Sequence, residues 1–135
     1  MYNIFVISNM TIPESIAELF QTLAAPARVA ILIAIGRGES CVCHLEAILG
    51  LRQATLSQHL MALRKAGLLQ DRKAGRYVYY SLRHPALLDL LKSAAVFSGT
   101  DADQVEKMAN PNPGPNCECP SCLPAFITLE ELPHR

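Results

Sequence analysis

The chain has 135 residues, a formal net charge of zero and 50% hydrophobic residues. This length favours one domain, and the apolar content, mainly Leu, Ile and Ala without Trp, favours helices. No apolar run reaches the roughly 20 residues that span a bilayer, and residues 1–10 lack the basic start and small-residue cleavage site of a signal peptide. We therefore expect a cytoplasmic protein with reduced thiols and no membrane partner.

Basic residues are concentrated in one stretch of this neutral chain. Between Arg52 and Arg83, seven basic residues accompany one acidic residue, Asp71, and the resulting charge of +6 is balanced by −6 elsewhere. Such a stretch is typical of a surface that binds a polyanion such as nucleic acid. A solvated charged face would give the same pattern, so charge alone leaves both interpretations open.

The N-terminal half of the chain predicts three helices. Thr11 can cap the first helix while Glu14 reaches back to its backbone, and an apolar stripe with helical spacing continues as far as Leu23. A second helix, apolar on nearly all sides, is expected over residues 26–35. A short third helix fits residues 44–49, closed by a glycine.

A fourth helix is predicted from about Gln53 to Ala66. Leu56, Leu60 and Leu63 form its buried stripe, and small or polar side chains lie on another face. A face of that kind beside basic residues suits the DNA major groove, although an ordinary amphipathic helix with a solvated side shows the same pattern. The residues expected to contact DNA from this helix are Gln53, Thr55, Ser57, Gln58 and His59.

The period of the apolar residues then changes from 3.6 to 2. Residues 68–72 and 76–82 predict two strands joined by a glycine-containing turn. Arg72, Lys73 and Arg76 stand at the tip of this hairpin, where we expect them to contact phosphate groups. An apolar helix over residues 85–97 either covers the core or pairs with its copy in a dimer, and a further helical turn or two fits residues 101–109.

The five cysteines form two clusters on either side of these elements. Cys41 and Cys43 precede the fourth helix, and Cys117, Cys119 and Cys122 follow an extended linker rich in Pro, Asn and Gly at 110–116. Together they could bind a soft ion, because three thiolates suit As(III), Sb(III) or Pb(II) and four suit Cd(II) or Zn(II). The linker allows the tail to reach either subunit of a dimer, and a disordered, metal-free tail is the alternative.

Cys41 and Cys43 cannot both face one ion from an ideal helix, because residues i and i+2 point about 200° apart. Either the third helix begins after Cys43, or metal binding unwinds its first turn. Unwinding would pull on the fourth helix and change the spacing of the two recognition helices in a dimer. That spacing must match one turn of DNA, about 34 Å, so a small shift should weaken binding.

Residues 54–69 and 72–82 closely resemble the ArsR/SmtB family of bacterial metal-sensing repressors. The Ser-Gln-His-Leu run at 57–60, the Leu-Arg-Lys-Ala-Gly-Leu turn at 63–68 and the Gly-Arg-x-x-x-Tyr wing at 75–80 occur in register. The resemblance covers about residues 12–97. It implies a mainly α, winged helix-turn-helix fold with a small β-hairpin wing, and a homodimer that binds an inverted-repeat operator and releases it when metal binds.

The resemblance also implies that Cys41 and Cys43 match the thiolate site of the arsenic, cadmium and lead branches of the family. An acid usually follows the second cysteine there, but His44 follows it here, either as an extra donor or, in the interpretation we favour, as a surface residue. The His/Asp site of the nickel, cobalt and zinc branches is not expected, because His84 lacks a paired partner. Cadmium-type relatives bring further thiolates from the N-terminus, and here the tail cysteines would replace them.

These observations predict a repressor and not an enzyme. We expect an N-terminal extension at 1–10, a winged helix-turn-helix domain at 11–98 and a cysteine-containing tail at 99–135. The expected inducer is As(III), Sb(III), Cd(II) or Pb(II), with Zn(II) also compatible. The alternative is a redox or reactive-sulfur sensor on the same fold. An oxidoreductase dithiol at Cys119 and Cys122 is not expected, because no strand precedes it.

Overall fold

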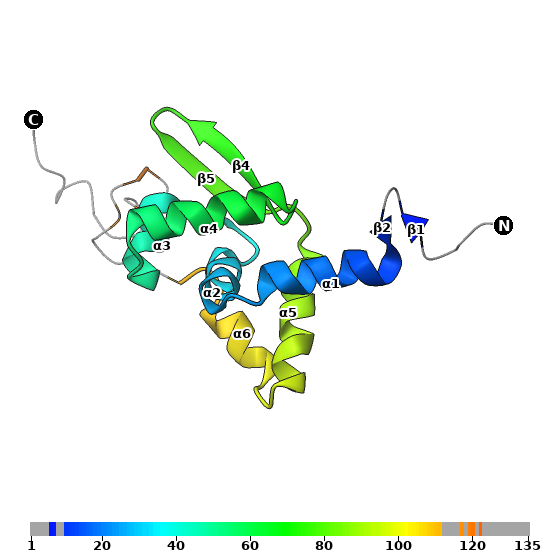
Figure 1. The fold of residues 1–135 in the computed structure, drawn as a ribbon. Coiled ribbons are helices and arrows are strands. Elements are labelled where there is room, and N and C mark those ends of the chain that lie inside the picture. Colours follow the sequence, from blue (N-terminus) through cyan, green and yellow to red (C-terminus); the bar gives the residue numbers. More distant parts are fainter. Residues whose placement is uncertain (1–5, 8–9, 112–116, 118, 121, 123–135) are drawn as a thin grey trace, which may run out of the picture.

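The computed structural model describes residues 6–7, 10–111, 117, 119–120 and 122. Six helices and five short strands follow one another along this part of the chain (Figure 1). The elements are β1 (Val6–Ile7), β2 (Met10–Thr11), α1 (Ile12–Leu23), α2 (Pro26–Ile35), β3 (Glu39–Cys41), α3 (Val42–Leu49), α4 (Gln53–Lys65), β4 (Leu69–Ala74), β5 (Tyr77–Leu82), α5 (Ala86–Phe97) and α6 (Ala102–Met108).

The start of α1 has the hydrogen bonds that its sequence predicts. The hydroxyl of Thr11 accepts from the Glu14 backbone at 3.2 Å, and the Thr11 backbone donates to the Glu14 carboxylate at 3.1 Å. This reciprocal arrangement satisfies donors that a helix leaves unpaired in its first turn. In α2 the helix begins at Pro26 without a side-chain cap at Ala25, so its stability depends on burial.

The core lies where α2, α3, α4 and α5 meet. The predicted stripe of α4 is confirmed, since Leu56, Leu60 and Leu63 are almost completely buried against Ile31 and Leu88. Each such side chain contributes roughly 1.5–3 kcal/mol through burial of apolar surface. No single described helix is long and apolar enough to cross a bilayer, although α1 and α2, which lie 87° apart, would pass that test of length and composition together.

The predicted hairpin is confirmed, and a third strand joins it. The sheet order is β3-β5-β4, antiparallel throughout, with Arg72 opposite Tyr79 across the hairpin. Strand β3, which the sequence did not predict, pairs with β5 and places Cys41 opposite Tyr79. Three residues are too few to show a period, so β3 exists because β5 offers it a free edge.

Helix α3 begins two residues earlier than predicted, at Val42. Cys41 is its N-cap, with extended backbone angles (φ −80°, ψ 167°), and the Cys41 Sγ accepts from the His44 backbone at 3.3 Å. The first of the two expected alternatives for this region is wrong, and the second, unwinding when metal binds, stays a prediction. The helix does not begin after Cys43, and it need not unwind, because it begins between the two cysteines.

Helix α6 folds back against α5 and α2 and directs the chain toward the end of α2 (Figure 1). The Asn110 backbone donates to the carbonyl of Ala34 at 2.9 Å. Arg37 forms ion pairs with Asp89 of α5 at 3.5 Å and with Glu106 of α6 at 3.4 Å. The segment that precedes the tail cysteines is therefore attached to the core at its last described turn.

Candidate metal centre and nucleic-acid interface

The fold brings all five cysteines together at the N-terminus of α3. Cys41 and Cys43 approach to 2.7 Å between their Sγ atoms, and the Sγ of Cys117 lies 3.5 Å and 3.1 Å from them, respectively. Cys119 lies 3.5 Å from Cys117. All five are free thiols. Because Cys41 precedes the helix and Cys43 lies in its first turn, their side chains converge despite the i, i+2 spacing.

His44 belongs to this cluster, and the interpretation of it as a surface residue is wrong. Its side chain is buried, with only 7% of its surface exposed, and its Nδ1 lies 3.2 Å from the Sγ of Cys122. The other ring nitrogen, Nε2, makes no hydrogen bond of ordinary length and angle with any described residue. Cys122, from the far end of the chain, thus lies against the imidazole, and a contact of this kind has no signal in the local sequence of α3.

The potential ligand atoms form two overlapping groups. Within each group, every donor atom lies within 4.8 Å of every other. One group has the four thiols Cys41, Cys43, Cys117 and Cys119, and the other has His44, Cys117 and Cys122. Cys117 alone belongs to both. The donor types, thiols with one imidazole, suit soft and borderline metal ions and not Mg²⁺ or Ca²⁺.

Burial and mutual hydrogen bonding shift the acidity of these thiols in opposite directions. Burial raises the pKa of Cys41 and Cys122, and it raises the pKa of Cys43 to about 11. Burial opposes ionisation of Cys119 as well, but hydrogen bonds from Cys41, Cys122 and Cys117 outweigh it and lower the pKa of Cys119 to about 7. Among these four thiols Cys119 therefore ionises most easily, and binding of a metal to Cys41, Cys43 or Cys122 must release protons.

The imidazole of His44 is held mainly in its neutral form. Burial lowers its pKa, and the backbone carbonyl of Pro111 opposes this shift. Neutral imidazole is the form that binds metal ions. The charge state of His44 is therefore compatible with a ligand role.

A cavity of about 360 Å³ connects the cysteines to both elements that were predicted to bind DNA. Cys41 and Cys43 line it together with Gln53, the first residue of α4, and Arg76, at the wing turn. Tyr77 forms another wall, with the Arg76 guanidinium 5.6 Å from its ring centroid. A movement of these two thiols would therefore change the shape of a cavity that the predicted DNA-binding residues Gln53 and Arg76 also line.

The residues of α4 that were predicted to contact bases differ in their exposure to solvent. Gln53, Thr55, Ser57 and Gln58 are exposed. His59 is half-buried, and its Nδ1 accepts a hydrogen bond from Arg28 at 3.2 Å. Only the Nε2 side of its ring is left for DNA. Arg28 was not singled out from the sequence, because nothing in the pattern of α2 indicates a partner thirty residues away.

The wing presents one paired and two unpaired basic side chains to solvent. Arg72 donates to the carboxylate of Glu39 at 2.6 and 3.2 Å and lies 4.8 Å from the centroid of the Tyr79 ring. The Arg72 guanidinium lowers the pKa of Glu39. Among the described residues, Lys73 and Arg76 form no ion pair. Glu39 could not be singled out from the sequence, because its strand was not predicted.

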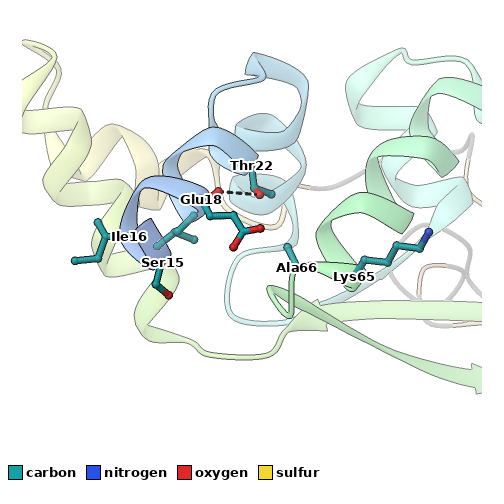
Figure 2. Close-up of a pocket in the computed structure, with 7 residues that line it drawn as sticks. Ser15, Ile16, Glu18, Thr22, Lys65 and Ala66 are labelled. Atoms are coloured by element: carbon teal, nitrogen blue, oxygen red, sulfur yellow. Dashed lines mark hydrogen bonds between the residues drawn. The ribbon is translucent and has the colours of Figure 1, made fainter. Parts of the chain in front are cut away.

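A second hollow, of about 420 Å³, lies between α1 and the end of α4 (Figure 2). Glu18 and Lys65 are its charged residues, and the Thr22 hydroxyl donates to the carbonyl of Glu18 at 3.1 Å (Figure 2). No thiol or imidazole lines it. Its lining offers no convergent set of donors, so the cysteine cluster remains the stronger candidate site.

A hairpin wing beside a helix-turn-helix defines the class of winged helix-turn-helix regulators. A sequence model of the family described as bacterial regulatory protein, arsR family, matches residues 25–71. A cadmium resistance transcriptional regulatory protein, a CadC homologue of Staphylococcus aureus, is 36% identical over 83 residues, which cover 61% of this chain and 69% of the relative. The chain belongs to the ArsR family, whose matched members are transcriptional regulators and not enzymes.

Two further relatives match shorter parts of their own chains. The transcriptional repressor SmtB homologue of Synechocystis is 37% identical over 82 residues, covering 61% of this chain and 62% of the relative. The arsenic resistance transcriptional regulator ArsR1 of Pseudomonas putida is 47% identical over 68 residues, covering 50% and 52%. The chain thus spans between half and two thirds of the length of these two relatives.

Solved structures confirm the winged helix-turn-helix fold. The Mycobacterium tuberculosis protein Rv0081 has a TM-score of 0.61 and 35% identity, over 65% of this chain and 89% of its own. A homodimeric winged helix-turn-helix DNA-binding domain from Mycobacterium bovis has a TM-score of 0.59 and 26% identity, over 65% of this chain and 82% of its own. The predicted fold class is therefore correct.

Proposed function

We propose that this protein is a homodimeric repressor that leaves its operator when a thiophilic metal or metalloid ion binds its cysteine cluster. The observation that carries the proposal is the convergence of Cys41 and Cys43 with Cys117, across more than seventy residues of sequence, to Sγ distances of 3.5 Å or less. In the cytoplasm these thiols would stay reduced and available to an ion. Relatives described as arsenic and cadmium resistance regulators support a response to soft ions.

The four-thiol group can accept either class of inducer. Sulfur atoms bound to one tetrahedral ion at about 2.3 Å lie about 3.8 Å apart, and the four Sγ atoms here already lie within 4.8 Å of one another. Cd(II) or Zn(II) would use four thiolates, and As(III), Sb(III) or Pb(II) would use three of them. The proposed ligands are Cys41, Cys43, Cys117, Cys119 and Cys122.

The coupling to DNA would pass through Cys41, which ends β3 and caps α3. Strand β3 pairs with wing strand β5, and α3 packs against α4. An ion that draws Cys41 toward the tail would therefore move the wing strand and the recognition helix together. This mechanism replaces the unwinding of α3, and it depends on continuous packed elements with two arrangements.

The tail has a second attachment through which metal binding could act. The Asn110 backbone is hydrogen-bonded to the end of α2, and α6 packs on α5.

An apolar cavity of about 500 Å³ opens among α1, α2, α5 and α6, with Phe20 and Met108 in its lining. The side chains of Phe20, Val96 and Phe97 are exposed. We assign this apolar face to the second copy of the chain, which the homodimeric Mycobacterium bovis relative supports.

DNA would bind to the face of α4 and to the wing. The exposed residues Gln53, Thr55, Ser57 and Gln58 would read bases, with His59 at the edge of the contact. Lys73 and Arg76 would contact phosphate directly, and Arg72 would do so by leaving Glu39. A domain at 11–98 with a sensing tail at 99–135 and a short extension at 1–10 is the organisation that this proposal uses.

The proposal is tested by gel-shift titration of the reduced protein on its operator with As(III), Sb(III), Cd(II), Pb(II) and Zn(II). At least one ion should release the DNA near stoichiometric concentration, and the same ion should have no effect when a chelator is in excess. Binding that no ion relieves would overturn the metal-sensing proposal.

A redox or reactive-sulfur sensor remains a second candidate because of one distance. The Sγ atoms of Cys43 and Cys117 lie 3.1 Å apart, close enough that oxidation could link helix and tail after a small movement. Peroxide or polysulfide should then lower the DNA affinity of the metal-free protein in the presence of chelator. If peroxide leaves DNA binding unchanged while an ion releases it, this candidate is excluded.

A further inference from the structure

His44 is the group at the cysteine cluster that a single-ion site would not use. Its ring is buried with 7% of its surface exposed, and its Nδ1 is aimed at the Sγ of Cys122 at 3.2 Å. Its Nε2 makes no hydrogen bond of ordinary length and angle with any described residue. The ring also interacts with the backbone carbonyl of Pro111, so Nδ1, which faces the sulfur of Cys122, is the nitrogen placed to bind an ion.

The donors are too many and too widely spread for one ion. Structural sites for Zn(II) and Cd(II) take four ligands, and four thiols already form one complete group. His44 and Cys122 belong to the other group, which shares only Cys117 with the first. A thiolate sulfur has enough lone pairs to bind two ions at once, and Cys117 is the donor placed to do so.

The charge of the cluster also favours a second ion. If all five thiols ionise around one divalent ion, the buried site has a net charge of −3, and a second divalent ion reduces it to −1. Uncompensated buried charge opposes folding and binding. The neutral imidazole adds a ligand without adding negative charge, which suits the second position.

We propose that the chain holds two divalent ions in a thiolate-bridged pair, the second of them bound by Cys117, Cys122 and His44. The ion class is Zn(II) or Cd(II), because imidazole and thiolate together suit these borderline and soft d¹⁰ ions. The three protein ligands leave one position open for water. Each cysteine that binds loses its proton to solvent, and no oxidation or reduction takes place. The inference rests on the proposed metal-binding function and adds a second site to it.

The test is a titration of the reduced full-length protein with Cd(II), read in parallel as bound metal per chain, as cadmium NMR and as release of operator DNA. Wild type should bind two ions and give two cadmium resonances that are coupled to each other through the shared sulfur. His44→Ala and the more conservative Cys122→Ser should each bind one ion and lose the resonance of the mixed-ligand site. His84→Ala, which removes an exposed histidine from the segment between β5 and α5, is the matched control and should still bind two.

The outcomes separate this inference from the function on which it rests. One ion per chain in wild type, with no loss in His44→Ala and with DNA release intact, would overturn the second site and leave the sensing function in place. Two ions that depend on His44 but do not release DNA would support the second site and overturn the sensing function. As(III) should bind in one equivalent in wild type and in His44→Ala alike, because it takes three thiolates.

Discussion

Cys41 and Tyr79 are paired across β3 and β5, so this thiol belongs to the sheet of the wing as well as to the N-terminus of α3. The Tyr79 ring packs in the same buried cluster as Cys41 and the tail cysteines, and the Arg72 guanidinium lies 4.8 Å from its centroid. One residue pair therefore links the proposed metal site to the proposed phosphate contacts. This short connection is the physical basis for the predictions below.

Cys41→Ser should separate folding from sensing. Serine is a good N-cap, so the hydroxyl should replace the Sγ that accepts from the His44 backbone, and α3 should form normally. We expect DNA affinity within about threefold of wild type, equivalent to well under 1 kcal/mol, and loss of metal-induced release. Fluorescence anisotropy with labelled operator measures both.

Ser40→Ala is the matched control for Cys41→Ser. Its hydroxyl is buried without a hydrogen-bond partner among the described residues, so its removal should leave both folding and the metal response unchanged. A metal response that survives in Cys41→Ser would remove Cys41 from the sensing path.

Glu39→Gln should strengthen DNA binding. The substitution removes an acidic group from the wing and frees Arg72, which Glu39 holds at 2.6 Å. Exposed ion pairs of this kind are weak, so we expect a modest gain in operator affinity, of no more than about fivefold, and a steeper dependence on salt. Affinities measured at several salt concentrations check this, with Glu18→Gln on α1 as the control. An unchanged salt dependence would show that Arg72 does not reach phosphate.

Gly36→Ala should loosen the attachment of α6 and the tail. Gly36 has a φ of +58°, and an added Cβ would lie 2.9 Å from the Cβ of Ala109. With a ψ of −136° this backbone conformation lies outside the left-handed helical region and costs a residue with a side chain about 1–3 kcal/mol. We expect a further loss of stability from the contact with Ala109, and a weaker Cd(II) affinity because the tail loses its position.

Gly50→Ala is a control for a positive φ without this contact. Gly50 has a φ of +65° and a ψ of 19°, in the left-handed helical region, and nothing lies within 4 Å of an added Cβ, so its loss of stability should be the smaller of the two. Both variants should lose stability to urea, and only Gly36→Ala should also lose metal affinity. Equal metal affinities in the two variants would show that docking of α6 does not position the tail.

The metal-free protein should lose stability in alkaline solution. The pKa of Cys43 is raised from 9.0 to about 11, mainly by burial, so the folded state favours the protonated thiol. A group raised in this way contributes stability that is complete below about 9 and is lost as the pH rises toward 11. Urea denaturation with chelator present should show this loss between these two pH values, and Cys43→Ser should show less of it. A flat profile in wild type would contradict the burial of this thiol.

The regular elements could be predicted because their signals are local. The stripe Leu56, Leu60 and Leu63 has helical spacing, the hairpin has alternation and a glycine turn, and Thr11 with Glu14 forms a capping box. Each depends on neighbours a few residues away. The five cysteines named from the sequence also converge in the structure, and their role as metal ligands stays a prediction.

The remaining features depend on contacts between distant segments. Strand β3 pairs with β5, and His44 is buried in contact with Cys122, nearly eighty residues further along the chain. The start of α3 moved because a cysteine sulfur caps it, and cysteine is not among the usual N-cap residues. The extended linker allowed the tail to reach either subunit, so its position on its own α3 could not be predicted.

The most direct test of the central claim is release of operator DNA by Cd(II) or As(III), measured by anisotropy under reducing conditions for wild type and for the chain with Cys117, Cys119 and Cys122 replaced by serine. Both proteins should bind DNA with similar affinity before metal is added. Wild type should release DNA at about one to two equivalents of ion, and the tail variant should need at least tenfold more. Equal release by the two proteins would contradict the claim that helix and tail cysteines form one sensing site.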